Sequence, residues 1–364
     1  MMSKLRPSGR RSLSLAERTE KFWNWFGDNE EKISRMFPFK TQCEADKLIS
    51  LVSSGTKLIS ENIYYNLGGD HEFIFSIEDW PDLFVIYPYI ISCMPERLKS
   101  EWNFLPCNPG TDDPFVFRMN NVEIETAEIM IRATYSEENR VFDITYFARD
   151  LDTLSELQSN GTMLVILEQT LGDRLSYIYV GAITRSEKFE EGMIQLPGLR
   201  KHIKEVLAAR GNELCEDPRL NFGVYHMEPK ESKEPRFDIV TGYTSLDSIL
   251  AGYYNGSTKL VDHIRSFGAK AVYLAYNNPD NLNLSDLTKF RNEIEDKITC
   301  EIIEPLNNAQ LIGAATGLIN SYVDFIVYDY DSFVSALRDF MKQYPHLSSY
   351  LAEFKMHAHK TIIS

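Results

Sequence analysis

Cysteine is scarce in this sequence, and its positions form no recognisable pattern. The 364 residues contain five cysteines, an odd number, and no CxxC pair. A disulfide framework favours an even count in a small secreted chain, so we expect five reduced thiols. This favours a reducing compartment and predicts a cytoplasmic protein. The five positions are Cys43, Cys93, Cys107, Cys215 and Cys300.

Long hydrophobic runs are absent as well. No apolar stretch approaches the roughly 18–20 residues that a membrane-spanning helix needs. Near the N-terminus, the apolar residues within 13–16 are too few to form the core of a signal peptide. We therefore expect no association with a membrane.

Positive charge is in deficit. The chain has 38 Lys and Arg against 53 Asp and Glu, which gives a net charge of −15 at pH 7. Such a chain repels phosphate backbones, which disfavours nucleic acid as a partner. Residues 1–15 are the exception, since they contain Lys4, Arg6, Arg10 and Arg11 and no acidic residue. A basic binding arm and a disordered tail both fit this segment, and we expect a disordered tail.

The sequence lacks the familiar motifs of catalytic and cofactor sites. Neither GxGxxG nor GxSxG occurs. A phosphate-binding loop needs a lysine directly after its last glycine, but Leu318 follows the run Gly313–Gly317, which we interpret as a tight turn. His357 and His359 would share one face of a strand, but the spacing of a zinc site is missing. We therefore expect no cofactor and no metal.

The remaining composition is that of a globular protein with a large interior. Hydrophobic residues make up 43% of the chain, and its length favours two domains because single cores stop growing near about 250–300 residues. Prolines and the charge run 230–234 break up residues 212–235, which predicts a linker there. The predicted parts are a disordered basic tail at 1–15, an N-terminal α+β domain at 16–211, a linker at 212–235 and a C-terminal α+β domain at 236–364.

Residue patterns predict hairpins in the first half of the chain and alternating strands and helices in the second. They indicate an α+β fold of two lobes, with mainly antiparallel or mixed sheets and helices packed on one face. The predicted hairpin strands are 62–67 with 72–77 and 129–134 with 141–147. The predicted C-terminal elements include strands at 300–303, 311–314 and 322–328 and helices at 284–298, 332–344 and 347–355.

An aromatic cluster lies in a predicted amphipathic helix at 17–37. Its residues Trp23, Trp25 and Phe26 could form a ligand platform or the face of a helix that docks onto a core. We expect core packing, because aromatic stripes at helical spacing usually have that role.

Three short stretches resemble one family. Residues 22–26 (FWNWF) and 29–32 (NEEK) form an FWxWFxxNE-type opening, residues 167–173 (LEQTLGD) are similar to an LDxxLGE segment, and residues 313–329 (GAATGLINSYVDFIVYD) are similar to a GGATG…YxDFIxxD pattern. Together they resemble a group of bacterial proteins that is defined as domains of unknown function.

The resemblance implies a bacterial protein with an α+β fold, and it implies no catalytic residues. Relatives of this general kind occur among presumed immunity proteins of bacterial toxin systems, which are typically acidic and cytoplasmic. This sequence departs from the family pattern at Glu168, where aspartate is expected, and at Asp173, where glutamate is expected.

Asp324 is the most informative single acid. It interrupts the predicted strand 322–328, which is apolar on both faces apart from this carboxylate. A buried carboxylate without hydrogen-bond donors would cost several kcal/mol. Asp324 could bind a ligand or act as a base, with Thr316 as a second binding residue, or it could accept hydrogen bonds from the backbone and hydroxyl groups of residues 315–320. We favour the second, structural interpretation.

Three classes of function fit these observations. We expect a non-enzymatic protein-binding protein of the immunity type, because an acidic chain can associate quickly with a basic partner protein. A hydrolase-type enzyme that lacks a standard motif would instead show a deep pocket in which polar groups converge. A scaffold or oligomerisation module would show a large exposed apolar patch.

Overall fold

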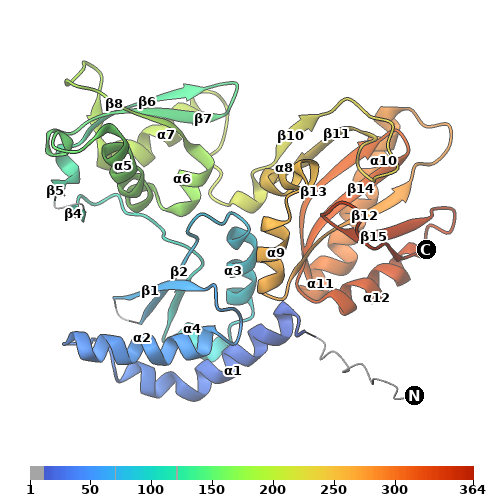
Figure 1. Cartoon of the computed structure of the whole chain (residues 1–364), viewed down its shortest axis with the longest axis horizontal. Helices are drawn as coiled ribbons and strands as arrows, with labels where there is room; N and C mark the ends of the chain where they lie inside the picture. Colours follow the sequence, from blue (N-terminus) through green and yellow to red (C-terminus); the bar gives the residue numbers. More distant parts are fainter. Residues whose placement is uncertain (1–11, 70, 120–121) are drawn as a thin grey trace, which may run out of the picture.

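The chain folds into three parts (Figure 1). An N-terminal lobe (15–105) and a middle lobe (116–208) lie beside a C-terminal domain (223–364). Helices and strands are mixed throughout, and the sheets are antiparallel or mixed, which confirms the predicted α+β class. The structure, a computed structural model, describes residues 12–69, 71–119 and 122–364. Among these residues, no helix combines the length and apolar composition that crossing a membrane requires.

The first helix, α1 (Leu15–Ser34), begins at a capping box. The Ser14 hydroxyl accepts a hydrogen bond from the Glu17 amide, and the Glu17 carboxylate accepts one from the Ser14 amide at 2.8 Å. This arrangement satisfies amide groups that a helix otherwise leaves unpaired at its start. Leu15 is fully buried, so the disordered tail predicted for 1–15 extends too far. The rest of that prediction, residues 1–11, lies outside the described residues.

The aromatic cluster of α1 packs into the core of the N-terminal lobe, as expected. Phe26 is fully buried and Trp23 is 3% exposed. The Trp23 indole donates a hydrogen bond of 2.8 Å to the Ile90 carbonyl, which satisfies its buried N–H group. The other elements of this lobe are α2 (Gln42–Thr56), β1 (Tyr64–Gly68), β2 (Glu72–Ser76), α3 (Leu83–Ser92), α4 (Glu96–Lys99) and β3 (Asn103–Leu105).

The middle lobe has a hydrophobic core of its own. Its main sheet has the order β8-β7-β6-β9, and the predicted hairpin is present as the antiparallel pair β6–β7. Its elements are β4 (Val116–Met119), β5 (Val122–Glu125), β6 (Met130–Ser136), β7 (Val141–Phe147), α5 (Glu156–Leu171), α6 (Asp173–Tyr179), β8 (Val180–Arg185), β9 (Ile194–Gln195) and α7 (Leu199–Ala208).

The C-terminal domain is built on a seven-stranded antiparallel sheet of order β10-β11-β13-β14-β12-β15-β16. Alternate residues of its strands enter different cores, so both faces are buried. Helices α8 and α9 contribute to one core, and α10 and α12 contribute to the other. The elements are β10 (Gly223–His226), β11 (Ile239–Thr244), α8 (Asp247–Asn255), α9 (Lys259–Ser266), β12 (Lys270–Asn277), α10 (Leu284–Ile298), α11 (Glu304–Leu306), β13 (Ala309–Gly317), β14 (Asn320–Val327), α12 (Tyr330–Met341), β15 (Ser349–Glu353) and β16 (Thr361–Ile362).

The N-terminal lobe and the C-terminal domain share one hydrophobic core, although the middle lobe separates them in sequence. The range 16–211, expected as one domain, therefore contains residues of two different cores. The range 212–235, expected as a linker, contains β10, which pairs with β11. The middle lobe is thus an insertion with its own core, joined to the rest of the chain at both ends.

Two predicted C-terminal elements are wrong. Residues 300–303 do not form a strand but a π-helical turn (Thr299–Ile303), because Ile298 and Ile302 continue the buried face of α10 at helical spacing. Residues 347–355 do not form a helix. Ser349–Glu353 is instead strand β15, which pairs with the otherwise open side of β12.

The glycine-containing run Gly313–Gly317 is not a tight turn either. It lies within β13, between β11 and β14. A side chain at Gly313 would overlap the backbone of β11, so small residues are needed here for close strand approach.

Candidate binding pocket

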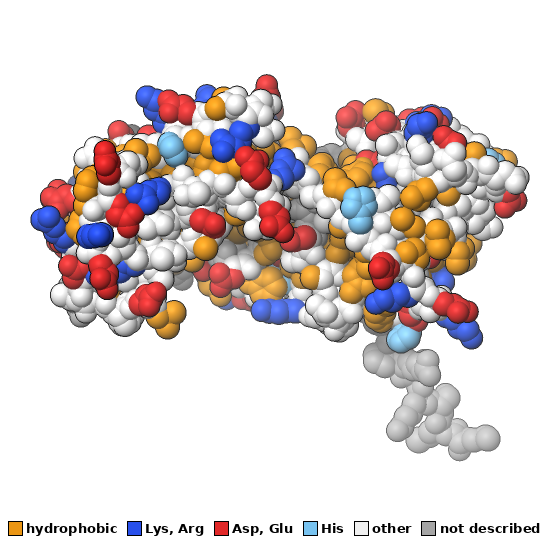
Figure 2. All heavy atoms as spheres, turned by 90° about the horizontal axis from the view of Figure 1, so that it is seen from above, with side chains coloured by type: hydrophobic (Ala, Val, Ile, Leu, Met, Phe, Trp, Pro, Cys, Tyr) orange, Lys and Arg blue, Asp and Glu red, His pale blue; other side chains and the backbone are white. Residues whose placement is uncertain are grey.

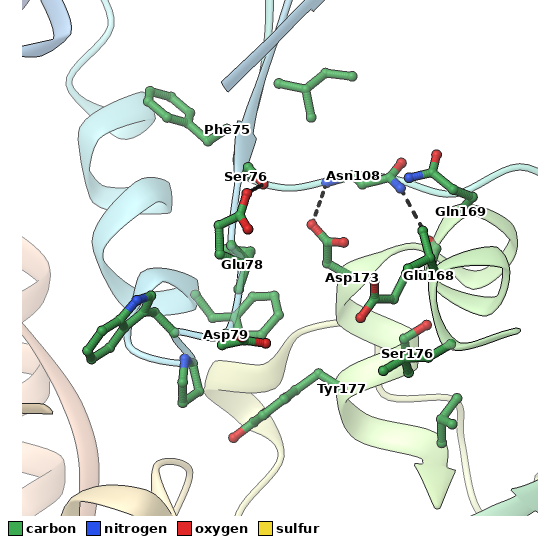
Figure 3. Close-up of a pocket in the computed structure, with 18 of the residues that line it drawn as sticks. Phe75, Ser76, Glu78, Asp79, Asn108, Glu168, Gln169, Asp173, Ser176 and Tyr177 are labelled. Atoms are coloured by element: carbon green, nitrogen blue, oxygen red, sulfur yellow. Dashed lines mark hydrogen bonds between the residues drawn. The ribbon is translucent and has the colours of Figure 1, made fainter. Parts of the chain in front are cut away.

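A cavity of about 820 Å³ lies between the N-terminal and middle lobes. Figure 3 shows residues at the end of β2 on one wall and residues of α5 and α6 on the other. Four carboxylates line the cavity, and none of its lining residues is Lys, Arg or His. On the outer face seen in Figure 2, acidic and basic side chains are interspersed instead. The four carboxylates belong to Glu78, Asp79, Glu168 and Asp173.

The wall from the N-terminal lobe is a short turn after β2. Glu78 has a φ of +48°, a left-handed conformation that is unfavourable for a glutamate. The Ser76 hydroxyl donates a hydrogen bond of 2.9 Å to the Glu78 carboxylate, which holds the side chain at the cavity (Figure 3). Asp79 and Trp80 follow and also line the cavity. Strained backbone is typical of functional sites, where the surrounding structure has to maintain it.

The wall from the middle lobe is fixed by the junction of α5 and α6. Gly172 joins the two helices with a φ of +81°, and Asp173 begins α6. The backbone N–H of Asn108 donates a hydrogen bond to Asp173 Oδ2 at 2.9 Å. The side-chain Nδ2 of Asn108 donates one to the backbone carbonyl of Glu168 at 3.2 Å (Figure 3). Asn108 belongs to the segment that leaves the N-terminal lobe. These contacts therefore join the C-terminal end of α5, which contains Glu168, to the segment that leaves the N-terminal lobe.

The same junction permits a close backbone contact. A Cβ atom at Gly172 would lie 2.6 Å from the Pro109 carbonyl carbon, which is too close for any side chain. Arg200 Nη2 donates to the Pro109 and Leu171 carbonyls, both at 2.9 Å, and so bridges the two segments. The contact between residues 108–111 and the α5–α6 junction fixes Asp173 in place.

The carboxylates of the pocket influence one another. Burial raises the pKa of Asp173 to about 6, against the opposing effect of the hydrogen bond from Asn108. Burial, together with the charges of Asp173, Asp79 and Glu78, raises the pKa of Glu168. A cation placed between these groups would relieve their repulsion.

The two site residues that we expected from the sequence lie elsewhere. Asp324 is 1% exposed, which confirms its predicted burial, and it accepts hydrogen bonds of 2.5 and 3.0 Å from the Arg236 guanidinium. Thr316 is fully buried and accepts a hydrogen bond of 3.2 Å from Arg291. Both residues lie within the sheet of the C-terminal domain. The burial of Asp324 and its hydrogen bonds from Arg236 support the structural interpretation of this carboxylate.

The expected donors to Asp324 were wrong. The amides of Ile319 and Asn320 do bind a carboxylate, but it is that of Asp238, at 3.0 and 2.9 Å. The turn therefore donates to the neighbouring acid Asp238 and not to Asp324, which pairs with the buried Arg236 instead.

Metal ligands do not converge in the part of the chain that the structure describes, since no group of three or more His, Cys, Asp or Glu side chains could hold an ion there. His357, one of the two histidines considered above, pairs with Glu234 at 2.5 Å.

No pattern in the sequence indicated the pocket directly. Glu168 and Asp173 lie in the stretch 167–173, which we noted only for its resemblance. The left-handed backbone conformation at Glu78 and the bend at Gly172 could not be assigned to one site from the sequence, because the two walls are about 90 residues apart along the chain. Comparisons with family models, with curated proteins and with solved structures found no match to this chain.

Proposed function

We propose that this chain is a non-enzymatic binding protein whose acidic pocket receives a positively charged group of a partner protein. The observation that carries the proposal is the 820 Å³ cavity lined by four carboxylates and by no basic residue. Opposite charges at distances near 4 Å attract strongly in a partly buried site, and the net charge of −15 would steer a basic partner toward it.

The partner that fits best is a basic protein that inserts a lysine-rich segment between the two lobes. A cavity of this size holds several side chains, and its acids come from two walls, so it can contact an inserted segment on both sides. The resemblance to presumed immunity proteins supports the same class, in which an acidic cytoplasmic protein neutralises a toxin.

A binding titration with pentalysine tests the proposal. Glu168→Gln and Asp173→Asn each remove one negative charge and keep the shape of the side chain, so each should weaken binding about tenfold. The matched control is Glu293→Gln, since Glu293 is exposed on α10 and does not line the pocket. The control should bind as the parent does. Equal affinities for the parent and both pocket variants would contradict the proposal.

The binding should also depend on pH. Asp173 has a pKa of about 6, so it takes up a proton as the pH falls from 7 to 5, while lysine stays charged at both values. The pocket then loses a negative charge, and pentalysine should bind about tenfold more weakly at pH 5. Asp173→Asn should lose most of this dependence, with a smaller remainder from Glu168, whose pKa is also raised. A parent affinity that is constant between pH 7 and 5 would rule out this role of Asp173.

One observation favours a hydrolase as the second candidate. Asp173 and Glu168 are neighbouring acids with raised pKa values, an arrangement that suits general acid–base catalysis near neutral pH. Purified protein can be screened with chromogenic glycosides and esters. Turnover that Asp173→Asn abolishes would favour the enzyme, and an inactive parent that binds pentalysine would favour the binding protein.

A further inference from the structure

A second cavity, of about 380 Å³, lies in the N-terminal lobe between residues 64–67 of β1 and residues of helix α2 (Figure 1). We call it the β1 groove. Three large hydrophobic side chains that line it are exposed to solvent, Phe39 at 43%, Ile49 at 48% and Tyr64 at 59%. None of the described residues that line the groove has a charged side chain. The β1 groove is therefore an exposed apolar surface.

The open edge of strand β1 faces this groove. Residues 64–67 are consecutive, and all four line the groove. Successive side chains of a strand point to opposite faces of the sheet, so a groove that is lined by all four residues lies along the edge of the strand. Among the described strands, β1 pairs only with β2, as the outer strand of the sheet β1-β2-β3. Alternate N–H and C=O groups of β1 therefore point away from β2 and toward the groove.

The sequence of β1 does not protect this edge. Proteins commonly protect an open strand edge with lysine or proline, and the β1 sequence YYNLG contains neither. An open edge offers hydrogen-bond donors and acceptors in alternation, and an extended peptide backbone can pair with them as an additional strand. The edge of β1 thus favours an extended polypeptide segment as the ligand of the groove.

The two faces of β1 have different surroundings. Tyr65 faces α2, since its hydroxyl donates a hydrogen bond of 3.0 Å to the Ile49 carbonyl. Asn66 points to the opposite face, where it lines the acidic pocket together with its cross-strand partner Ile74. Asn66 therefore contributes to the walls of both cavities. A strand added beside β1 would direct alternate side chains toward α2 and the others toward the acidic pocket.

We propose that the β1 groove binds an extended segment of the partner protein as an added strand, in which apolar side chains toward α2 alternate with lysine side chains toward the acidic pocket. This inference rests on the proposed function, because it names the conformation and the sequence pattern of the segment that the pocket receives. Charge disfavours a second copy of this chain as the ligand. The β1 strand of a second copy has no lysine to offer to the acids, and two chains of net charge −15 repel each other.

Two hexapeptides of equal composition test the sequence pattern. The peptide KVKVKV alternates lysine with valine, whereas KKKVVV has the same residues in two blocks. An added strand of KVKVKV can direct all its valines toward α2 and all its lysines toward the acidic pocket, which KKKVVV cannot do. KVKVKV should therefore bind about tenfold more tightly in a titration. Equal affinities of the two peptides would overturn the proposed pattern.

Methylation of the peptide backbone tests the strand pairing. In an extended strand the N–H groups of alternate residues point to the same edge, so the lysines and the valines of KVKVKV donate to opposite edges. One isomer is methylated at the three lysine nitrogens and the other at the three valine nitrogens. One of them loses its hydrogen bonds to β1, so the two affinities should differ at least about tenfold. Two isomers that bind equally well would show that no strand is added.

A variant of the groove wall tests the place of binding. Ile49→Gln should weaken KVKVKV about three- to tenfold, because valine side chains lose an apolar contact. Pentalysine has no apolar side chain to place there, and its affinity should stay the same. Leu306→Gln on α11 is the matched control, since Leu306 is 49% exposed and lines neither cavity. The control should bind both peptides as the parent does, and thermal melting checks that both variants fold.

The outcomes distinguish this inference from the proposed function. If Glu168→Gln and Asp173→Asn leave the binding of both KVKVKV and pentalysine unchanged, the proposed function is wrong, and so is the role of the lysines in the added strand. If binding depends on these acids but Ile49→Gln binds KVKVKV as the parent does, the β1 groove alone is overturned. A dimer of this chain in sedimentation that Ile49→Gln dissociates would assign the groove to a second copy and would also overturn the inference.

Discussion

Replacing Asp324 by leucine is expected to lower the free energy of unfolding by about 3–5 kcal/mol. The Arg236 side chain is fully buried and gives two hydrogen bonds to this carboxylate. Its guanidinium also lies 4.8–5.2 Å from the rings of Tyr273, Tyr322 and Phe354, so water has no access when the carboxylate is lost. Leucine would leave a buried positive charge without its carboxylate partner. Urea unfolding measures the loss directly.

Two further variants separate the charge from the hydrogen bonds. Asp324→Asn keeps one acceptor but removes the charge, so it should be less stable than the parent and more stable than Asp324→Leu. The double variant Arg236→Met with Asp324→Leu removes both charges and should recover most of the loss, because apolar replacements of a buried ion pair are often neutral. If Asp324→Leu alone unfolds at the same urea concentration as the parent, the buried charge of Arg236 does not need this carboxylate, and the prediction is wrong.

Replacing Gly172 by alanine is expected to cost about 2–5 kcal/mol, the sum of backbone strain and overpacking. The φ of +81° is unfavourable for alanine, and its Cβ would lie 2.6–2.7 Å from atoms of Asn108 and Pro109. The backbone would have to separate at the contact that holds Asp173. Affinity for pentalysine should therefore fall together with the melting temperature.

Gly192→Ala is the matched control for this prediction. Gly192 also has a positive φ, +86°, but apart from its chain neighbours no atom lies within 4 Å of the position of its Cβ. Gly192→Ala should lower the free energy of unfolding by the backbone strain alone, about 1–2 kcal/mol, and should bind pentalysine as the parent does. Equal losses in the two variants would mean that the close approach at Gly172 does not contribute.

The burial of Asp324 was predictable from its apolar strand neighbours, but its partner was not. Arg236 is 88 residues away in sequence and directly follows the segment 212–235, which was expected to be a linker. Burial follows from local pattern, whereas the pairing of a buried charge depends on which distant segment the fold brings to it.

Secondary structure followed the local pattern where that pattern was strong. Helix α10 has the predicted bounds of 284–298, because an Asn283 cap and a regular apolar face define it. The failure at 347–355 has a tertiary cause. Its apolar residues suit a helix, but β12 offers an unpaired edge, and pairing with that edge decides the structure.

The pocket could not be predicted, because its acids are ordinary members of a set of 53. Glu78 and Glu168 belong to lobes with different cores, and contacts such as that of Asn108 with the α5–α6 junction bring them to one cavity. A pattern in one segment carries no information about which acids of another segment will face it.

The most direct test of the acidic pocket is a crystal structure of the protein with bound pentalysine. The proposed function predicts a lysine ammonium about 2.7–3.0 Å from the carboxylate of Glu168 or Asp173, in the cavity between the two lobes. A peptide bound elsewhere on the surface, with these two carboxylates free of contact, would contradict it.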